Sequence, residues 1–231
     1  MKTLGLIGGM SWESTAIYYR LLNEIVRERF GGLHSAKLLL WSFDFAEIAE
    51  RQHAGDWEGA GTLFVEAARG LEAARAQGLV ICTNTMHKLA DEVQAAVSIP
   101  LIHIADATAR AVVHAGAKRP ALLATRFTME QDFYKGRLAD KYGLQLVVPD
   151  QAGRDMVHRV IYDELCQGII SEPSKAAYVE EVARMRRDEK IDGLIMGCTE
   201  ITMLIGQGDF DIPVFDTTRI HAEAAIDFAL S

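Results

Sequence analysis

Short apolar runs alternate with longer amphipathic stretches from one end of the chain to the other. The short runs predict strands, and the longer stretches predict the helices that connect them. Strands are expected at residues 3–7, 37–41, 79–82, 101–103, 121–124, 144–148, 193–196 and 214–215. Helices are expected, among other places, at residues 14–29, 57–76, 129–142, 155–167 and 174–188. This alternation is typical of an α/β fold in which helices cover both faces of a parallel sheet.

The chain contains two similar halves. Residues 4–11 and residues 121–128 each form an apolar strand followed by a loop of small polar residues. A second shared form recurs later in each half, at residues 78–85 and 192–200. Any two strand–helix units share some of this pattern, but a true repeat predicts two pseudo-symmetric parallel-sheet lobes. The equivalent strand ends would then face one another across a single cleft, which is where ligands of open α/β sheets bind.

Composition narrows the classes of function. The chain has 231 residues, 49% of them hydrophobic, which is enough for one large core or two modest ones. The net charge is −8 without a block of like charges, so no basic surface is expected for nucleic acid or an anionic membrane. No leader segment and no apolar run of the ~18–20 residues that span a membrane is present, so we expect a soluble, cytoplasmic protein that binds a small molecule.

Cys198 is the strongest candidate for chemistry. It follows an apolar strand and precedes a predicted helix, whose N-terminal amides would stabilise a thiolate and lower the pKa of the thiol. A base with a pKa near the working pH suits proton transfer. Glu200, two residues further on, either orients the ammonium group of a substrate or is an ordinary carboxylate of a first helical turn.

The counterpart of Cys198 in the first half is the loop of Thr83, Asn84 and Thr85. Its three side chains can donate hydrogen bonds to a carboxylate, although threonine and asparagine also favour helix N-caps. Cys82 precedes Thr83, and the alternation along a strand sends its side chain to the opposite face, into the core. Cys166 lies within a predicted helix and is expected to be inert. The three cysteines have neither the number nor the spacing of a disulfide framework or a zinc site.

Other polar residues near the predicted strand ends are weaker candidates. The glycines in residues 8–11 allow close approach of a ligand, but the third glycine of a dinucleotide-binding fingerprint is missing. Gln52 either reaches the cleft or lies in solvent. His87 and His103 stand near strand ends, where a histidine is more often packed and hydrogen-bonded than catalytic.

Five motifs together resemble the aspartate/glutamate racemase family over essentially the whole chain. They are Gly8-Gly9-Met10-Ser11, Cys82-Thr83-Asn84-Thr85-Met86-His87, Pro100-Leu101-Ile102-His103-Ile104-Ala105-Asp106, Gly197-Cys198-Thr199-Glu200 and Pro213-Val214-Phe215-Asp216-Thr217. The resemblance implies two lobes, residues 1–98 with 212–231 and residues 99–211, and a homodimer. It also implies an isomerase that needs neither pyridoxal phosphate nor a metal, in which two cysteines flank the substrate and exchange its α-proton on opposite faces.

The sequence departs from the family pattern at one of the two bases. The first cysteine of the family stands directly before the Asn-Thr pair, and here that position is Thr83, with the cysteine displaced to Cys82. The chain is most similar to the L-aspartate/glutamate-specific racemases, which implies that Cys198 serves the face of the L-isomer and Thr83 the opposite face. By position, the residues expected to line the pocket are Met10, Gln52, Thr83, Asn84, Thr85, Thr199 and Glu200.

Two other functions compete with a racemase. A single-cysteine enzyme similar to arylmalonate decarboxylase would need only one thiol, but the polar loop of Thr83, Asn84 and Thr85 argues against its apolar pocket. A catalytically silent protein that binds acidic amino acids would show binding without exchange of the α-hydrogen. The sequence does not distinguish aspartate from glutamate, because one methylene in a pocket changes binding by only about 1–3 kcal/mol.

Overall fold

The computed structural model describes residues 1–231 and divides them into two compact units. The first unit comprises Met1–Ile104 and His221–Ser231, and the second comprises Ala105–Ile220. Each unit is a three-stranded parallel sheet with helices on both sides, so the predicted α/β fold with two parallel-sheet lobes is confirmed. No helix combines the length and the apolar character needed to cross a membrane.

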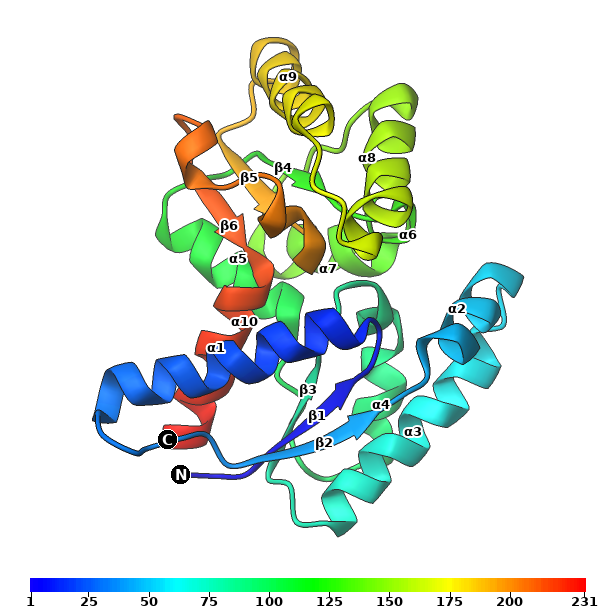
Figure 1. Ribbon diagram of the computed structural model, residues 1–231, viewed down its shortest axis with the longest axis vertical. Coiled ribbons are helices and arrows are strands. Elements are labelled where there is room, and N and C mark those ends of the chain that lie inside the picture. The colour runs from blue at the N-terminus through cyan, green and yellow to red at the C-terminus, as the bar shows by residue number, and fades with distance from the viewer. The chain divides into compact units, whose positions relative to one another are not determined.

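The first unit has the strand order β2-β1-β3, and all its pairings are parallel (Figure 1). Its strands are β1 (Leu4–Gly8), β2 (Leu38–Ser42) and β3 (Gly78–Ile81). Its helices are α1 (Trp12–Phe30), α2 (Phe45–Ala54), α3 (Trp57–Ala73), the 3₁₀ helix η1 (Thr85–Leu89) and α4 (Ala90–Ala96).

Alternation along the strands divides the core of the first unit between two faces of the sheet. Leu4 and Leu6 of β1 join a buried cluster with α1 and with α10 (Thr217–Leu230), whereas Ile7 packs into the cluster formed by α3. Cys82 belongs to the same cluster as Leu4 and is 1% exposed. The prediction that Cys82 is a core residue is therefore confirmed.

The second unit has the strand order β4-β5-β6, again parallel throughout. Its strands are β4 (Pro120–Leu123), β5 (Gly193–Met196) and β6 (Val214–Asp216). The helices before β5 are α5 (Ile104–His114), α6 (Arg126–Glu130), α7 (Asp132–Tyr142), α8 (Gln151–Asp163), η2 (Leu165–Gln167) and α9 (Glu172–Glu189). The 3₁₀ helices η3 (Thr199–Met203) and η4 (Gln207–Asp209) follow β5.

Two isolated bridges complete the repeat between the units. Leu101 pairs with β3 and Val147 pairs with β4, both in parallel. The four positions across the sheet are therefore β2, β1, β3 and Leu101 in the first unit, and Val147, β4, β5 and β6 in the second. β3 and β5 are equivalent strands, so Thr83 and Cys198 each stand two residues beyond the end of the same strand of the repeat.

Several elements differ from the prediction. The strands expected at 101–103 and 144–148 are reduced to single bridges at sheet edges. The helix expected at 129–142 is divided into α6 and α7 by the extended backbone of Gln131. The helix expected at 155–167 begins earlier, at Gln151, because Asp150 caps it through the backbone amide of Gly153, and it ends at Asp163.

The unit boundaries also lie later than the expected 98/99 and 211/212. Residues 99–104 remain with the first sheet because the amide of Ile102 donates to Leu79 and that of Ile104 donates to His87. β6 pairs with β5, so residues 212–220, which were expected in the first lobe, belong to the second unit.

Candidate functional site

The end of β5 carries Cys198 on a closely packed turn. A Cβ at the preceding residue, Gly197, would lie 2.8 Å from Cδ1 of Leu122 and 3.0 Å from Cβ of Ala124, so the backbone of this turn packs closely against the end of β4. Cys198 itself has an extended backbone and is followed immediately by η3. β5 therefore ends two residues before Cys198, which is partly exposed.

The thiol of Cys198 donates a hydrogen bond to a carboxylate. The distance from its Sγ to Oε2 of Glu200 is 2.9 Å, and Glu200 is buried at 8% exposure. Burial and the negative charge of Glu200 raise the pKa of the Cys198 thiol well above its ordinary value. The expectation that a helix N-terminus lowers the pKa of the Cys198 thiol is therefore wrong while the Glu200 carboxylate beside it is charged. The helix is a five-residue 3₁₀ helix, and the adjacent carboxylate opposes a thiolate.

Two tyrosines and a second thiol lie near this pair. Burial raises the pKa of Tyr162 in α8, and the charges of Cys198, Cys166 and Glu200 raise it further. Tyr178 in α9 is shifted in the same direction, first by burial and then by Cys198. Cys166 lies in η2, which packs on η3, so it is a neighbour of Cys198 and not a remote helical residue. Sequence reasoning missed this set because its members lie far apart along the chain.

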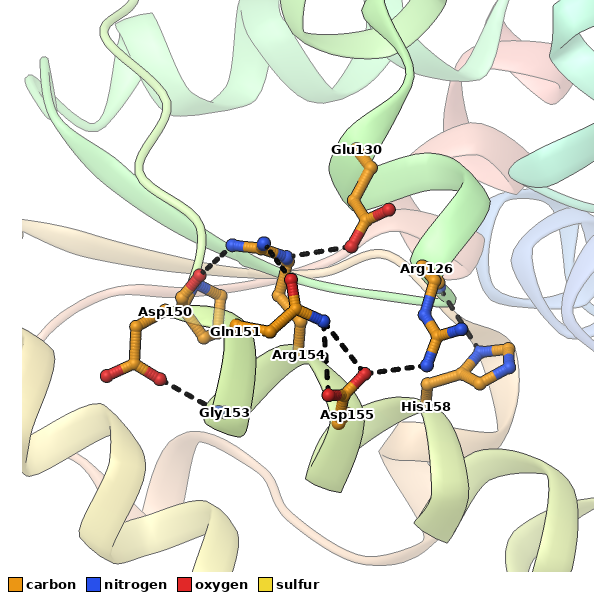
Figure 2. Close-up of polar contacts among 9 residues, drawn as sticks. Arg126, Glu130, Asp150, Gln151, Gly153, Arg154, Asp155 and His158 are labelled. Carbon is orange, nitrogen blue, oxygen red and sulfur yellow. Dashed lines mark hydrogen bonds and ion pairs between the residues drawn. The ribbon is translucent and has the colours of Figure 1, made fainter.

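A polar network joins α8 to α6, the short helix that follows β4. The guanidinium of Arg126 donates to Oδ1 of Asp155 at 2.6 Å, and the backbone amide of Arg126 donates to Nδ1 of His158 at 3.3 Å (Figure 2). Arg154 donates to Glu130 at 2.9 Å in the same network. These contacts fix the helix that presents Tyr162 beside Cys198.

The loop after β3 carries the candidates of the first unit. The hydroxyl of Ser14 donates to the carbonyl oxygen of Cys82 at 3.2 Å, and Thr83 follows with partial exposure. Asn84 and Thr85 are buried at 3% and 7% exposure. The side chain of Asn84 does not cap η1, so the alternative that this loop serves as a side-chain N-cap is not realised.

The remaining expected pocket residues are buried. Met10 is 6% exposed and packs in the core cluster that includes Ile7. Gln52 lies in α2 at 6% exposure and is therefore not a solvated surface residue. Thr199 is 4% exposed, and its hydroxyl oxygen accepts from Thr218 at 3.3 Å.

The expected site residues form two groups. The first group is Cys198, Thr199 and Glu200, which are consecutive residues after the end of β5 in the second unit. Met10, Gln52 and residues 83–85 belong to the first unit, where β1 and β3 are neighbouring strands. Each group contains hydrogen-bonding side chains next to the carboxyl end of a parallel strand, where α/β proteins bind ligands.

The fold is thus a repeated parallel α/β unit, and a thiol–carboxylate pair stands at the end of one of its strands. The whole chain superposes on all of a candidate Asp/Glu racemase from Yersinia pestis with 53% identity and a TM-score of 0.95. It also covers all of an aspartate racemase homologue from Pyrococcus horikoshii OT3, with 36% identity and a TM-score of 0.89. A broad specificity amino-acid racemase from Bacillus subtilis is 19% identical over 99% of this chain and 98% of its own length.

The family model described as Asp/Glu/hydantoin racemase matches residues 7–225. The chain therefore belongs to this family, and its relatives support an amino acid racemase.

Proposed function

We propose that the protein racemises aspartate, glutamate or both without a cofactor, and that Cys198 and Thr83 act on opposite faces of the α-carbon. The observation that carries this proposal is the hydrogen bond of 2.9 Å from the Cys198 thiol to the buried Glu200 carboxylate. A thiol needs a proton acceptor before it can act as a base, and Glu200 is already in contact with its proton.

The first step transfers the thiol proton to Glu200 and leaves a thiolate on Cys198. The thiolate then removes the α-proton of the L-isomer, so that a thiol is formed again and the electron pair of the C–H bond passes to the substrate carboxylate as an enediolate. The ammonium group of the substrate stabilises the negative charge that develops in this step. Glu200, on this proposal, serves the thiol directly, which is a more specific role than orienting the ammonium group.

The second step delivers a proton to the opposite face. The hydroxyl of Thr83 donates its proton to the α-carbon, and a water molecule returns one to the threonine oxygen. Glu200 then gives the proton it holds to the hydroxide that this leaves, which restores the resting enzyme. A threonine hydroxyl is too weak an acid to wait as an alkoxide near neutral pH, so it cannot replace a thiolate as a resting base. The two faces are therefore served by groups of unequal acidity. Met10, Gln52, Asn84, Thr85 and Thr199 are proposed to hold the substrate.

Hydrogen exchange in D₂O tests the proposal. The two enantiomers have equal free energy in water, so racemisation must be equally efficient in both directions in terms of kcat/KM. The unequal bases instead predict that deuterium enters Cα of L-aspartate or L-glutamate faster than the substrate racemises, because Cys198 returns solvent deuterons to the same face. Cys198→Ala should abolish both processes, and Cys82→Ala is the matched control that removes a core thiol and retains both.

Thr83→Cys supplies a second thiol and should raise racemisation relative to exchange. An unchanged ratio of the two rates in Thr83→Cys, or equal rates in the wild type from the L-isomer, would show that Thr83 is not the weaker acid. Calorimetric binding of aspartate or glutamate with no exchange of the α-hydrogen would instead select a silent binding protein.

A further inference from the structure

Three buried histidines form a cluster, and one of them, His87, contacts the loop of Thr83. His87, His103 and His221 are 3%, 8% and 0% exposed and come from η1, from the segment before α5 and from α10. The ring of His87 contacts both of the others, with its centroid 4.7 Å from that of His103 and 5.4 Å from that of His221. The motif that contains Thr83 also contains His87, to which the proposed reaction assigns no role.

The hydrogen bonds of His87 define its protonation state. Nδ1 lies 2.7 Å from the carbonyl oxygen of Thr83, which can only accept, so Nδ1 carries the hydrogen and donates it. Nε2 lies 3.2 Å from the backbone N–H of Ile104, which can only donate, so Nε2 is the acceptor. His87 is therefore a neutral imidazole of a single tautomer that connects Thr83 to Ile104, the first residue of α5.

Both peptide groups that flank Thr83 are held by side chains. Ser14 donates to the carbonyl oxygen of Cys82 at 3.2 Å, on the N-terminal side, and His87 donates to that of Thr83 on the C-terminal side. The orientations of these two peptide planes determine the φ and ψ angles of Thr83, and with them the direction of its Cα–Cβ bond. The position of the Thr83 hydroxyl thus depends on the orientation of the His87 ring.

We propose that His87 is a positioning residue that aims the Thr83 hydroxyl at the α-carbon of the substrate. This inference rests on the role proposed for Thr83 in racemisation. A proton donor held on a loop must be placed within about a hydrogen-bond length of its target, and an error of about 1 Å costs on the order of a hundredfold in rate. Loss of the Nδ1–H contact would therefore impair delivery by Thr83 and spare same-face exchange by Cys198.

A pair of amide variants separates the two nitrogens of the ring. In His87→Asn the amide nitrogen takes the place of Nδ1 and can donate to Thr83, whereas in His87→Gln the amide reaches the place of Nε2. We expect His87→Asn to keep the wild-type ratio of deuterium wash-in to racemisation from the L-isomer. His87→Gln and His87→Leu should raise this ratio by on the order of tenfold to a hundredfold.

A purely structural role for His87 would lower wash-in and racemisation in parallel, which would leave the ratio unchanged and overturn the proposal. The proposal would also be overturned if His87→Asn and His87→Leu had the same ratio of deuterium wash-in to racemisation. If the leucine variant does not fold, as judged by circular dichroism and urea unfolding, the Asn and Gln variants still decide the question.

Thr83→Val distinguishes failure of this inference from failure of the proposed function. An unchanged ratio in Thr83→Val would remove Thr83 from the reaction, and the inference about His87 would fall with it. A raised ratio in Thr83→Val, together with unchanged ratios in all His87 variants, would overturn the role of His87 alone.

Discussion

Lowering the pH from 7 to 4 tests the burial of His221 in the first unit. The Nε2–H of this histidine donates to the carbonyl oxygen of Ile102 at 2.6 Å, and its Nδ1 accepts from the hydroxyl of Tyr18 at 2.8 Å. Burial lowers the pKa of His221 from the ordinary 6.5 to about 4. The folded protein therefore holds His221 neutral in a pH range where the unfolded chain is protonated.

The sign and size of the effect follow from this difference. Between pH 6.5 and 4 the unfolded state binds more protons at this residue, so the free energy of unfolding falls as the pH falls. Each pH unit of the difference corresponds to about 1.36 kcal/mol, which gives a loss of about 3 kcal/mol by pH 4 from this residue. This loss is a large part of the roughly 5–15 kcal/mol that stabilises a folded protein.

Urea unfolding, measured from pH 7 to 4, isolates the contribution of His221 when the wild type is compared with His221→Gln. The glutamine retains a donor for Ile102 and does not titrate, so the variant is less stable at pH 7 but should lose about 3 kcal/mol less on acidification. His34→Gln, at an exposed position, is the control that should follow the wild type. Equal losses for the wild type and His221→Gln would refute the buried, neutral histidine.

Three further predictions concern the strand ends. Gly9→Ala should destabilise the protein by about 1–3 kcal/mol more than Gly116→Ala in urea unfolding, because both glycines have positive φ but only a Cβ at Gly9 would overlap a backbone carbonyl oxygen. Iodoacetamide, followed by mass spectrometry, should modify Cys198 faster as the pH rises above neutrality and should leave the fully buried Cys82 unmodified until the protein unfolds. Glu200→Gln removes a charge that raises the pKa of Cys198, so modification of Cys198 by iodoacetamide should shift to lower pH. The same variant should lower the rate of racemisation by about 10²–10⁴-fold, because Glu200 no longer accepts the thiol proton. An unshifted pH profile of labelling would contradict this electrostatic role.

The sequence was sufficient for the class of fold and for the repeat. Apolar strands such as residues 193–196 are buried on both faces, so their identity is visible as an unbroken apolar run. The alternation of Leu4, Leu6 and Ile7 between two core clusters follows from the two-residue period of a strand, which also assigned Cys82 to the core. The motifs around Thr83 and Cys198 likewise indicated the family from local sequence.

Properties that depend on residues distant in the sequence required the tertiary structure. The short segments 101–103 and 144–148 had strand-like sequences, but at the sheet edges each makes only a bridge. The assignment of β6 to the second unit follows from its pairing with β5, which no local pattern encodes.

The state of Cys198 shows the same division between sequence and structure. Sequence placed the thiol at a strand end, and from that position alone a lowered pKa was expected. Only the folded chain shows that burial and the contact with Glu200 raise the pKa, and that Tyr162 and Cys166 lie close by. The position of a residue in an element is a local property and can be predicted from periodicity, whereas desolvation and Coulomb interaction depend on every atom packed around a group, wherever it lies along the chain.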